Sequence, residues 1–271
     1  MRFHLPLHHV IYQLPIRFPI MRLNTAFDFT TDSKGYWDGM WENDPALGVS
    51  KVDPDAKSDT LRYYQYLLYR RELPNGEFFD LQYHNKPNLV WNGKRFSSDS
   101  IIVSFRYRRY PVMEEISARP DFRQWVEGYL KEAYTIGGEM LFPVDPSINS
   151  VRGFNNNSVS DRFDLTLYCI QEYYKGTESL DDYGLDRVLD AVRKNGNFFD
   201  KFLNFKGYVD FFFLQDAVDE NYDTILYLDY LGKPRSVKDY DIFLAMEMDF
   251  LRKRNKRISE IELKPVVYSP L

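Results

Sequence analysis

The sequence predicts one α+β domain in which helices dominate and a few short strands are scattered between them. Three observations lead to this prediction. Apolar residues recur at helical spacing along much of the chain, short extended segments lie between turn residues, and 271 residues fit one hydrophobic core. Because aromatic residues make up 17% of the chain, we expect a core rich in phenylalanine and tyrosine rings.

The first 21 residues differ in composition from the rest of the chain. Residues 1–27 lack Asp and Glu, and three of the four histidines, His4, His8 and His9, lie there among three prolines. The prolines interrupt any helix, and the continuous apolar stretch of a signal peptide is absent. We therefore expect residues 1–21 to be an extension outside the core and residues 22–271 to form the single domain.

Capping and turn residues define the elements in the first half of the chain. Ser58 is placed to cap a helix over residues 59–71. Pro120 suits the first turn of a helix over residues 120–134, and Gly137 and Gly138 end it. Short strands are predicted at residues 78–81, 89–91 and 139–142, with a turn at residues 74–76.

Apolar spacing defines the elements in the second half. Phe163, Leu167, Ile170 and Tyr174 share one face of a helix predicted over residues 161–175. Further helices are predicted at residues 185–194, 197–204 and 236–257, and a strand at residues 225–228.

For two segments the sequence does not decide between helix and strand. Residues 97–105 favour a short helix, but Ile101, Ile102 and Val103 are β-branched, so a strand is the alternative. Residues 208–218 are strongly apolar, and their length favours a buried helix over a strand.

Composition excludes several classes of chemistry. Beyond residue 20 the chain has one histidine, His84, and the only cysteine is Cys169. The chain therefore has too few His and Cys side chains for a metal site built from them or for a proton relay based on histidine. Phosphate-binding glycine loops, dinucleotide fingerprints and nucleophile elbows are absent from the sequence. We predict no cofactor and no bound metal, and a buried, unreactive thiol at Cys169.

Charge and hydropathy restrict the partners. The net charge of −5 opposes sequence-independent attraction to nucleic acid or anionic lipid. No apolar run is long enough to cross a bilayer, so we expect no membrane contact and a cytoplasmic location. Two local basic segments still allow an anionic partner. Residues 105–110 alternate aromatic and arginine side chains, and residues 252–257 end the last predicted helix, where a dipole contact explains them as well.

The candidate site is the polar segment that leads into the helix predicted at residue 161. Long loops in compact domains tend to be functional, and a helix N-terminus attracts anions. The predicted ligand-binding residues are Ser147, Asn149, Arg152, Asn155, Asp161, Arg162 and Asp164. In the structural alternative, Arg152 or Arg162 pairs with Asp161 or Asp164 and only fastens the loop to the helix. No catalytic residue is assigned.

Several motifs resemble a bacterial family of unknown function. They are Ser147–Gly153 (SINSVRG), Asp161–Leu167 (DRFDLTL), Phe205–Asp216 (FKGYVDFFFLQD) and the shorter segments 58–62, 73–76 and 254–258. The resemblance covers most of the chain from about Phe27 onward. It implies a bacterial intracellular protein with one continuous domain, and it implies nothing about an activity.

Three functions fit these observations. The first is a binding module for an anionic ligand, such as a nucleotide or a nucleic-acid phosphate, and the polar segment and basic segments favour it. The second is an enzyme acting on phosphate esters or nucleic acid, in which Asp161 and Asp164 share a helix face and hold Mg²⁺. The third is a protein-interaction component of a stress or defence locus that uses an aromatic surface.

Overall fold

Three antiparallel strands form the only sheet among the residues that the computed structural model describes, which are 21–42, 53–83, 88–102, 112–144, 162–181 and 184–263. The strands are β1 (Leu89–Trp91), β2 (Lys94–Ser100) and β3 (Glu139–Pro143), in the order β1-β2-β3. Helices make up most of the remainder, so the predicted α+β class is confirmed.

A tight hairpin explains β1 and β2. Asn92 and Gly93 have φ values of 48° and 75°, as a two-residue turn with both central residues in the left-handed region requires. The turn brings Trp91 opposite Lys94, and β2 then pairs with β3 from Phe96 to Ser100. The helix predicted at residues 97–105 is therefore wrong over its described part, because residues 97–100 pair with β3, which fixes an extended backbone there. The strand alternative is confirmed.

The longer helices follow the predicted spacing, whereas α1 (Tyr36–Glu42), α2 (Pro54–Lys57) and α4 (Met113–Ser117) were not predicted. The others are α3 (Asp59–Tyr69), α5 (Phe122–Ala133), α6 (Phe163–Lys175), α7 (Asp186–Lys194), α8 (Gly196–Phe199), α9 (Phe205–Phe211) and α10 (Val237–Ser259). Ser58 caps α3 by accepting from the Leu61 N–H at 3.0 Å, as predicted. Ser236 caps α10 in a capping box with Asp239.

Several boundaries differ from the predictions, because side chains or single bridges take up the backbone hydrogen bonds. Residues 78–81 make only an isolated bridge, Glu72 to Phe78, and residues 225–228 are not a strand. The Tyr227 N–H donates to the Asp164 carboxylate at 2.9 Å, a bond that a strand would give to a neighbouring strand. The apolar stretch 208–218 is α-helical only as far as Phe211; Phe213 then adopts a φ of 58°, and the 3-10 turn η4 (Gln215–Ala217) follows.

Two further predicted helices end or divide differently. The helix predicted at residues 197–204 is split between α8 and the 3-10 turn η3 (Asp200–Phe202). The helix before Gly137 ends at Ala133, and both glycines lie in the 3-10 turn η1 (Ile136–Gly138).

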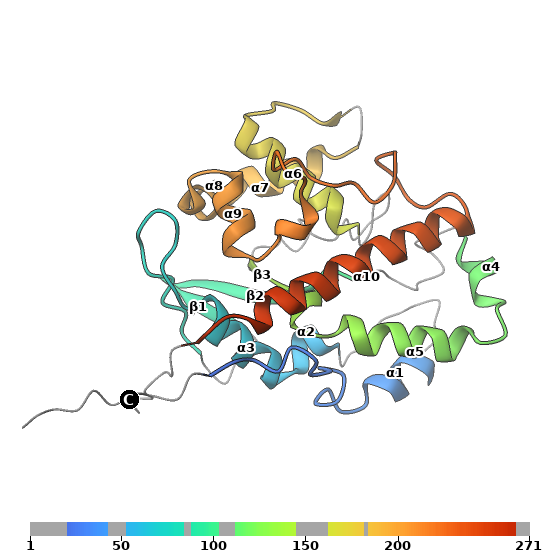
Figure 1. Cartoon of the computed structure of the whole chain (residues 1–271). Coiled ribbons are helices and arrows are strands. Elements are labelled where there is room, and N and C mark those ends of the chain that lie inside the picture. Colours follow the sequence, from blue (N-terminus) through green and yellow to red (C-terminus); the bar gives the residue numbers. More distant parts are fainter. Residues whose placement is uncertain are drawn as a thin grey trace, which may run out of the picture.

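The longest helix, α10, crosses the middle of the molecule and is flanked on both sides by other helices (Figure 1). Figure 1 shows α5 and α1 on one side of it and α6 to α9 on the other, with the sheet at its C-terminal half. The predicted aromatic core is confirmed: Phe198, Phe202, Tyr208 and Phe212 are buried, and Tyr208 and Phe212 have ring centroids 4.9 Å apart.

Candidate functional site

Two of the predicted site residues, Arg162 and Asp164, are described, and both are buried. Their side chains are 0% and 1% exposed and form an ion pair, with Nε of Arg162 donating to Oδ1 of Asp164 at 2.8 Å. Arg162 also donates to the Gly232 carbonyl oxygen at 2.8 Å. These two side chains thus fasten the start of α6 to the segment before α10, which is the structural alternative for this pair.

The other predicted site residues lie outside the described residues. They are Ser147, Asn149, Arg152, Asn155 and Asp161. The basic and aromatic segment at residues 105–110 and His84 lie outside them too. Ligand binding by these residues stays a prediction.

The basic segment that ends α10 divides into buried and exposed cations. Arg254 is fully buried and donates to the carbonyl oxygens of Gly137, Glu139 and Phe212 at 2.7, 3.0 and 3.2 Å. It is a structural residue that joins η1, β3 and the end of α9 to α10. Lys256 is exposed, and its side chain makes no hydrogen bond or ion pair with any residue that the structure describes.

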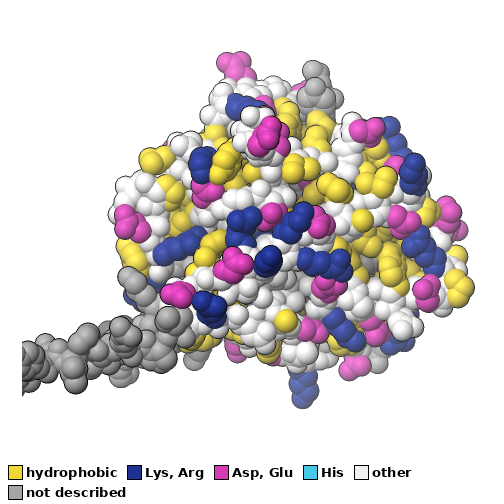
Figure 2. Space-filling model, in the orientation of Figure 1, with side chains coloured by type: hydrophobic (Ala, Val, Ile, Leu, Met, Phe, Trp, Pro, Cys, Tyr) yellow, Lys and Arg dark blue, Asp and Glu magenta, His cyan; other side chains and the backbone are white. Residues whose placement is uncertain are grey.

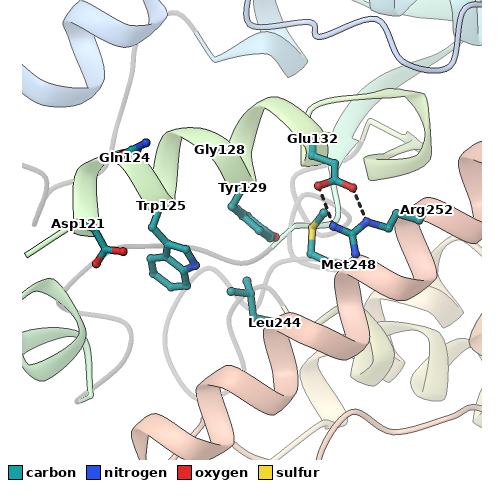
Figure 3. Close-up of a pocket in the computed structure, with 9 residues that line it drawn as sticks. All are labelled: Asp121, Gln124, Trp125, Gly128, Tyr129, Glu132, Leu244, Met248 and Arg252. Carbon is teal, nitrogen blue, oxygen red and sulfur yellow. Dashed lines mark hydrogen bonds and ion pairs between the residues drawn. The ribbon is translucent and has the colours of Figure 1, made fainter. Parts of the chain in front are cut away.

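A cleft of about 510 Å³ lies between α5 and α10, and we call it the α5–α10 cleft. Its lining residues recur every three or four positions on the facing sides of the two helices, as helical geometry requires. They are Asp121, Gln124, Trp125, Gly128, Tyr129, Glu132, Leu244, Met248 and Arg252 (Figure 3). Figure 2 shows hydrophobic side chains gathered in the hollow between the two helices.

The floor of the cleft is apolar and aromatic. Trp125 and Tyr129 point from α5 toward α10, and Leu244 and Met248 point back toward them (Figure 3). Beneath this floor the Tyr129 hydroxyl donates to the carboxylate of Glu247, which is fully buried. Burial, with the nearby carboxylates of Glu247 and Asp164, raises the pKa of the Tyr227 phenol well above its usual value.

An ion pair between the two helices closes one end of the cleft, and a second pair, from the turn before α5 to α10, flanks the other. At the closed end, Arg252 binds both carboxylate oxygens of Glu132, with Nη2 2.9 Å from Oε2 (Figure 3). Near the other end, Nη2 of Arg119 lies 3.1 Å from both oxygens of Asp241. The Arg119 guanidinium also lies over the Trp125 ring, 5.2 Å from its centroid.

Comparison with known proteins places the chain in a family. The family model described as Family of unknown function (DUF6994) matches residues 23–258. The chain belongs to DUF6994. The predicted resemblance to a family of unknown function is therefore confirmed, and the match takes in both helices of the α5–α10 cleft. No curated protein and no solved structure matches this DUF6994 member.

Three features of the described part of this DUF6994 member bear on its function: the grouping of metal-binding side chains, the length and hydropathy of its helices, and its single cysteine. Among the described residues, no group of three or more His, Cys, Asp or Glu side chains is placed to hold a metal ion, and no helix is long and apolar enough to span a membrane. Cys169 is buried in α6, and burial raises the pKa of its thiol. The prediction of a buried thiol is confirmed.

The sequence-based search for a site missed the α5–α10 cleft. Its residues come from two helices about 120 positions apart, which local spacing alone cannot bring together. One signal was present: Gly128 interrupts the face that Trp125 and Glu132 share on α5, where a better helix former is expected.

Proposed function

We propose that this protein is a binding module for a small anionic ligand with an apolar body, and that the α5–α10 cleft holds this ligand. The observation that carries the proposal is an apolar, aromatic floor that ends at a guanidinium, that of Arg252. The volume of about 510 Å³ lies within the range of small-molecule sites, roughly 300–1,000 Å³.

The Arg252 guanidinium, with Lys256 just beyond the cleft, supports an anionic head group. Arg252 and Lys256 are four residues apart on α10, so they lie on the same side of the helix one turn apart. Glu132, the present partner of Arg252, has a side chain that is 43% exposed. Exposed ion pairs contribute only about 0–1 kcal/mol, so a ligand carboxylate or phosphate can replace Glu132 at little cost. The planar guanidinium also suits two-point binding of such an anion.

The apolar floor supports an uncharged ligand body. Leu244 and Met248 are nearly buried, and Trp125 is half-buried beside them. Because Leu244 and Met248 are already buried, most of the apolar surface that a ligand can remove from water belongs to Trp125, at about 25 cal/mol per Å². A simple inorganic anion covers none of this surface, so we expect it to bind more weakly than an anion with a ring or chain.

Calorimetric titration tests the proposal. The panel contains inorganic phosphate, nucleoside monophosphates, aromatic carboxylates, aliphatic carboxylates and the neutral amides of these acids. We expect an aromatic or nucleotide anion to bind, its neutral analogue to bind more weakly, and Arg252→Ala to lose at least about tenfold in affinity, ~1.4 kcal/mol. Added salt should weaken the binding of the anion more than the binding of its neutral analogue.

Lys253→Ala is the matched control. Lys253 is the next residue on α10, its side chain is 54% exposed, and it pairs with Asp249 away from the cleft. Its removal should change the affinity by less than about twofold, ~0.4 kcal/mol. The proposal is rejected if no member of the panel binds, or if both variants keep the affinity of the wild type.

The polar segment before α6 remains a second candidate for anion binding. Its described members Arg162 and Asp164 are bound to each other, so the proposal there depends on Ser147, Asn149, Arg152, Asn155 and Asp161. Loss of affinity in Arg152→Ala with full affinity in Arg252→Ala would favour that segment over the cleft. A bacterial origin and a cytoplasmic location belong to the proposal as well.

The enzyme alternative has less support. It needs Asp164 as a Mg²⁺ ligand, but both of its oxygens already accept hydrogen bonds, from Arg162 and from the Tyr227 N–H. A side chain that is 1% exposed and neutralised in this way is poorly placed to bind a cation.

A further inference from the structure

Gly128 lies in the middle of α5 and lines the cleft between Trp125 and Glu132 (Figure 3). A glycine inside a helix destabilises the helix relative to alanine, because it orders a more flexible backbone. Such a glycine therefore calls for a reason, either in the backbone, in the packing or in a ligand.

The fold does not require glycine at this position. Several other glycines in the described chain have a positive φ or lie against other atoms: a Cβ at Gly138 would come within 1.9 Å of the Ala133 carbonyl oxygen, and one at Gly207 within 2.1 Å of the Phe202 carbonyl oxygen. A Cβ at Gly128 would meet no atom within 4 Å, and its backbone is helical. Among the described glycines whose surroundings are known, only Gly128 combines an ordinary backbone conformation with open space.

The open space at Gly128 is part of the cleft. Without a Cβ, the backbone of α5 is bare between the Trp125 ring on one turn and the Glu132 carboxylate on the next. Met248 lines the same cleft from α10 and lies beside Glu132 and Arg252 (Figure 3). An indole ring and a thioether both favour the face or edge of another aromatic ring over a saturated chain.

We propose that Gly128 determines specificity in the α5–α10 cleft by admitting a planar aromatic ring against the bare backbone of α5, so that the ligand is an aromatic anion. This inference rests on the proposed function. The ring lies beside Trp125 and Met248, and its anionic substituent reaches Arg252. A Cβ at position 128 occupies the space in which the ring edge would lie.

Gly128→Ala tests the inference, because binding and stability should change in opposite directions. Alanine is the better helix former, so the variant should unfold at a temperature about 1–4 °C above the wild type. Its affinity for 2-naphthoate should fall at least tenfold, whereas its affinity for hexanoate, an aliphatic anion of equal charge, should change less than twofold. The wild type should bind 2-naphthoate at least tenfold more tightly than hexanoate.

Three other outcomes are distinguishable. If the wild type binds both anions equally, or if Gly128→Ala keeps its affinity for 2-naphthoate, the role of Gly128 is refuted and the proposed function stands. If the wild type binds neither anion nor any nucleotide, the proposed function fails and this inference fails with it. If Gly128→Ala lowers the unfolding temperature, glycine is needed for the fold and the inference is refuted.

Gly128→Ser adds a small side chain of different polarity, and its affinity for 2-naphthoate should also fall at least tenfold.

Discussion

Arg162 and Asp164 form a buried ion pair across the first turn of α6, and neither side chain is more than 1% exposed. Every interaction of the pair is directed into the protein: the Tyr227 N–H and the Gly232 carbonyl oxygen bind it from the segment before α10. A charged pair in this position is tied to the fold, because either charge alone would be buried without compensation.

Removing one member of this pair should therefore be severe. We expect Asp164→Ala to lower the free energy of unfolding by about 3–5 kcal/mol, as urea denaturation measures it, because the Arg162 guanidinium stays buried without its carboxylate. Asp190→Ala, which breaks the exposed pair with Arg193, should cost less than about 1 kcal/mol. A value for Asp164→Ala close to that of this control would show that the pair is accessible to water.

Arg254 should be irreplaceable by lysine. Its guanidinium donates to three backbone carbonyl oxygens and, at 2.9 Å, to the Tyr69 hydroxyl, which is more than the single ammonium of lysine can reach. We expect Arg254→Lys to destabilise by about 3 kcal/mol or more, and Tyr69→Phe by about 1–2 kcal/mol, because one buried N–H then loses its acceptor. Equal unfolding midpoints for Arg254→Lys and the wild type would contradict this prediction.

Arg254 also shows where sequence reasoning stops. Five cations at the end of a predicted helix indicate a solvated, dipole-facing cluster, and Arg252 and Lys253 fit that interpretation. Arg254 does not, because its acceptors in Tyr69, Gly137 and Glu139 lie more than 100 positions earlier in the chain. Helical periodicity predicted α3, α5, α6, α7 and α10, since it depends only on near neighbours in the sequence.

Strands and the cleft depend on distant neighbours. For residues 97–100 of β2 the sequence favoured a helix over the strand alternative, because the pairing of these residues with β3 is not visible in their own side chains. In the same way, Tyr227 lies outside any strand because its N–H binds the Asp164 carboxylate, 63 positions away. The α5–α10 cleft needs two helices from different parts of the chain, and of its features only the mid-helix Gly128 could be noticed beforehand.

The capping box of α10 should make stability depend on pH in acid. The Tyr230 hydroxyl at 2.7 Å, followed by the Arg235 N–H at 2.9 Å, holds the pKa of the Asp239 carboxyl below its usual value. Because the folded-state pKa is the lower one, this contribution is complete above the ordinary value of 3.8 and is lost as the pH falls through the folded-state pKa. Urea midpoints should therefore separate the wild type from Asp239→Asn at pH 6 and converge once the pH lies below the folded-state pKa of Asp239.

Ser236→Ala serves as the control for this pH dependence. It removes the hydroxyl that accepts from the Asp239 N–H at 3.1 Å, and it removes no titrating group. We expect a loss of about 1 kcal/mol that varies much less with pH than the effect of Asp239→Asn. Parallel pH curves for the wild type and Asp239→Asn would refute the assigned role of the carboxylate.

Cys169 should not react with thiol reagents in the folded protein. It is 0% exposed in α6, so a reagent cannot reach its sulfur. Burial also raises the pKa of its thiol, so the reactive thiolate does not form. Labelling with a chromogenic disulfide should be at least about 1,000-fold slower than in urea, because it requires an opening of the structure. Ala118→Cys places a second thiol at an exposed position and should label within seconds. Equal rates for the two thiols would place Cys169 at the surface.

Glu132 should compete with the ligand for Arg252. We expect Glu132→Gln to change the free energy of unfolding by less than about 1 kcal/mol, because the pair is exposed, with side chains 43% and 63% accessible. The same variant should bind aromatic anions roughly 3- to 10-fold more tightly, a gain of ~0.6–1.4 kcal/mol, because the guanidinium no longer has to exchange a charged partner. The neutral amide of the same ligand should bind the variant and the wild type alike, which separates the charge effect from any change in the shape of the cleft. A weaker affinity for the anion in Glu132→Gln would mean that Glu132 holds Arg252 in its binding position, and that the two act together on the ligand.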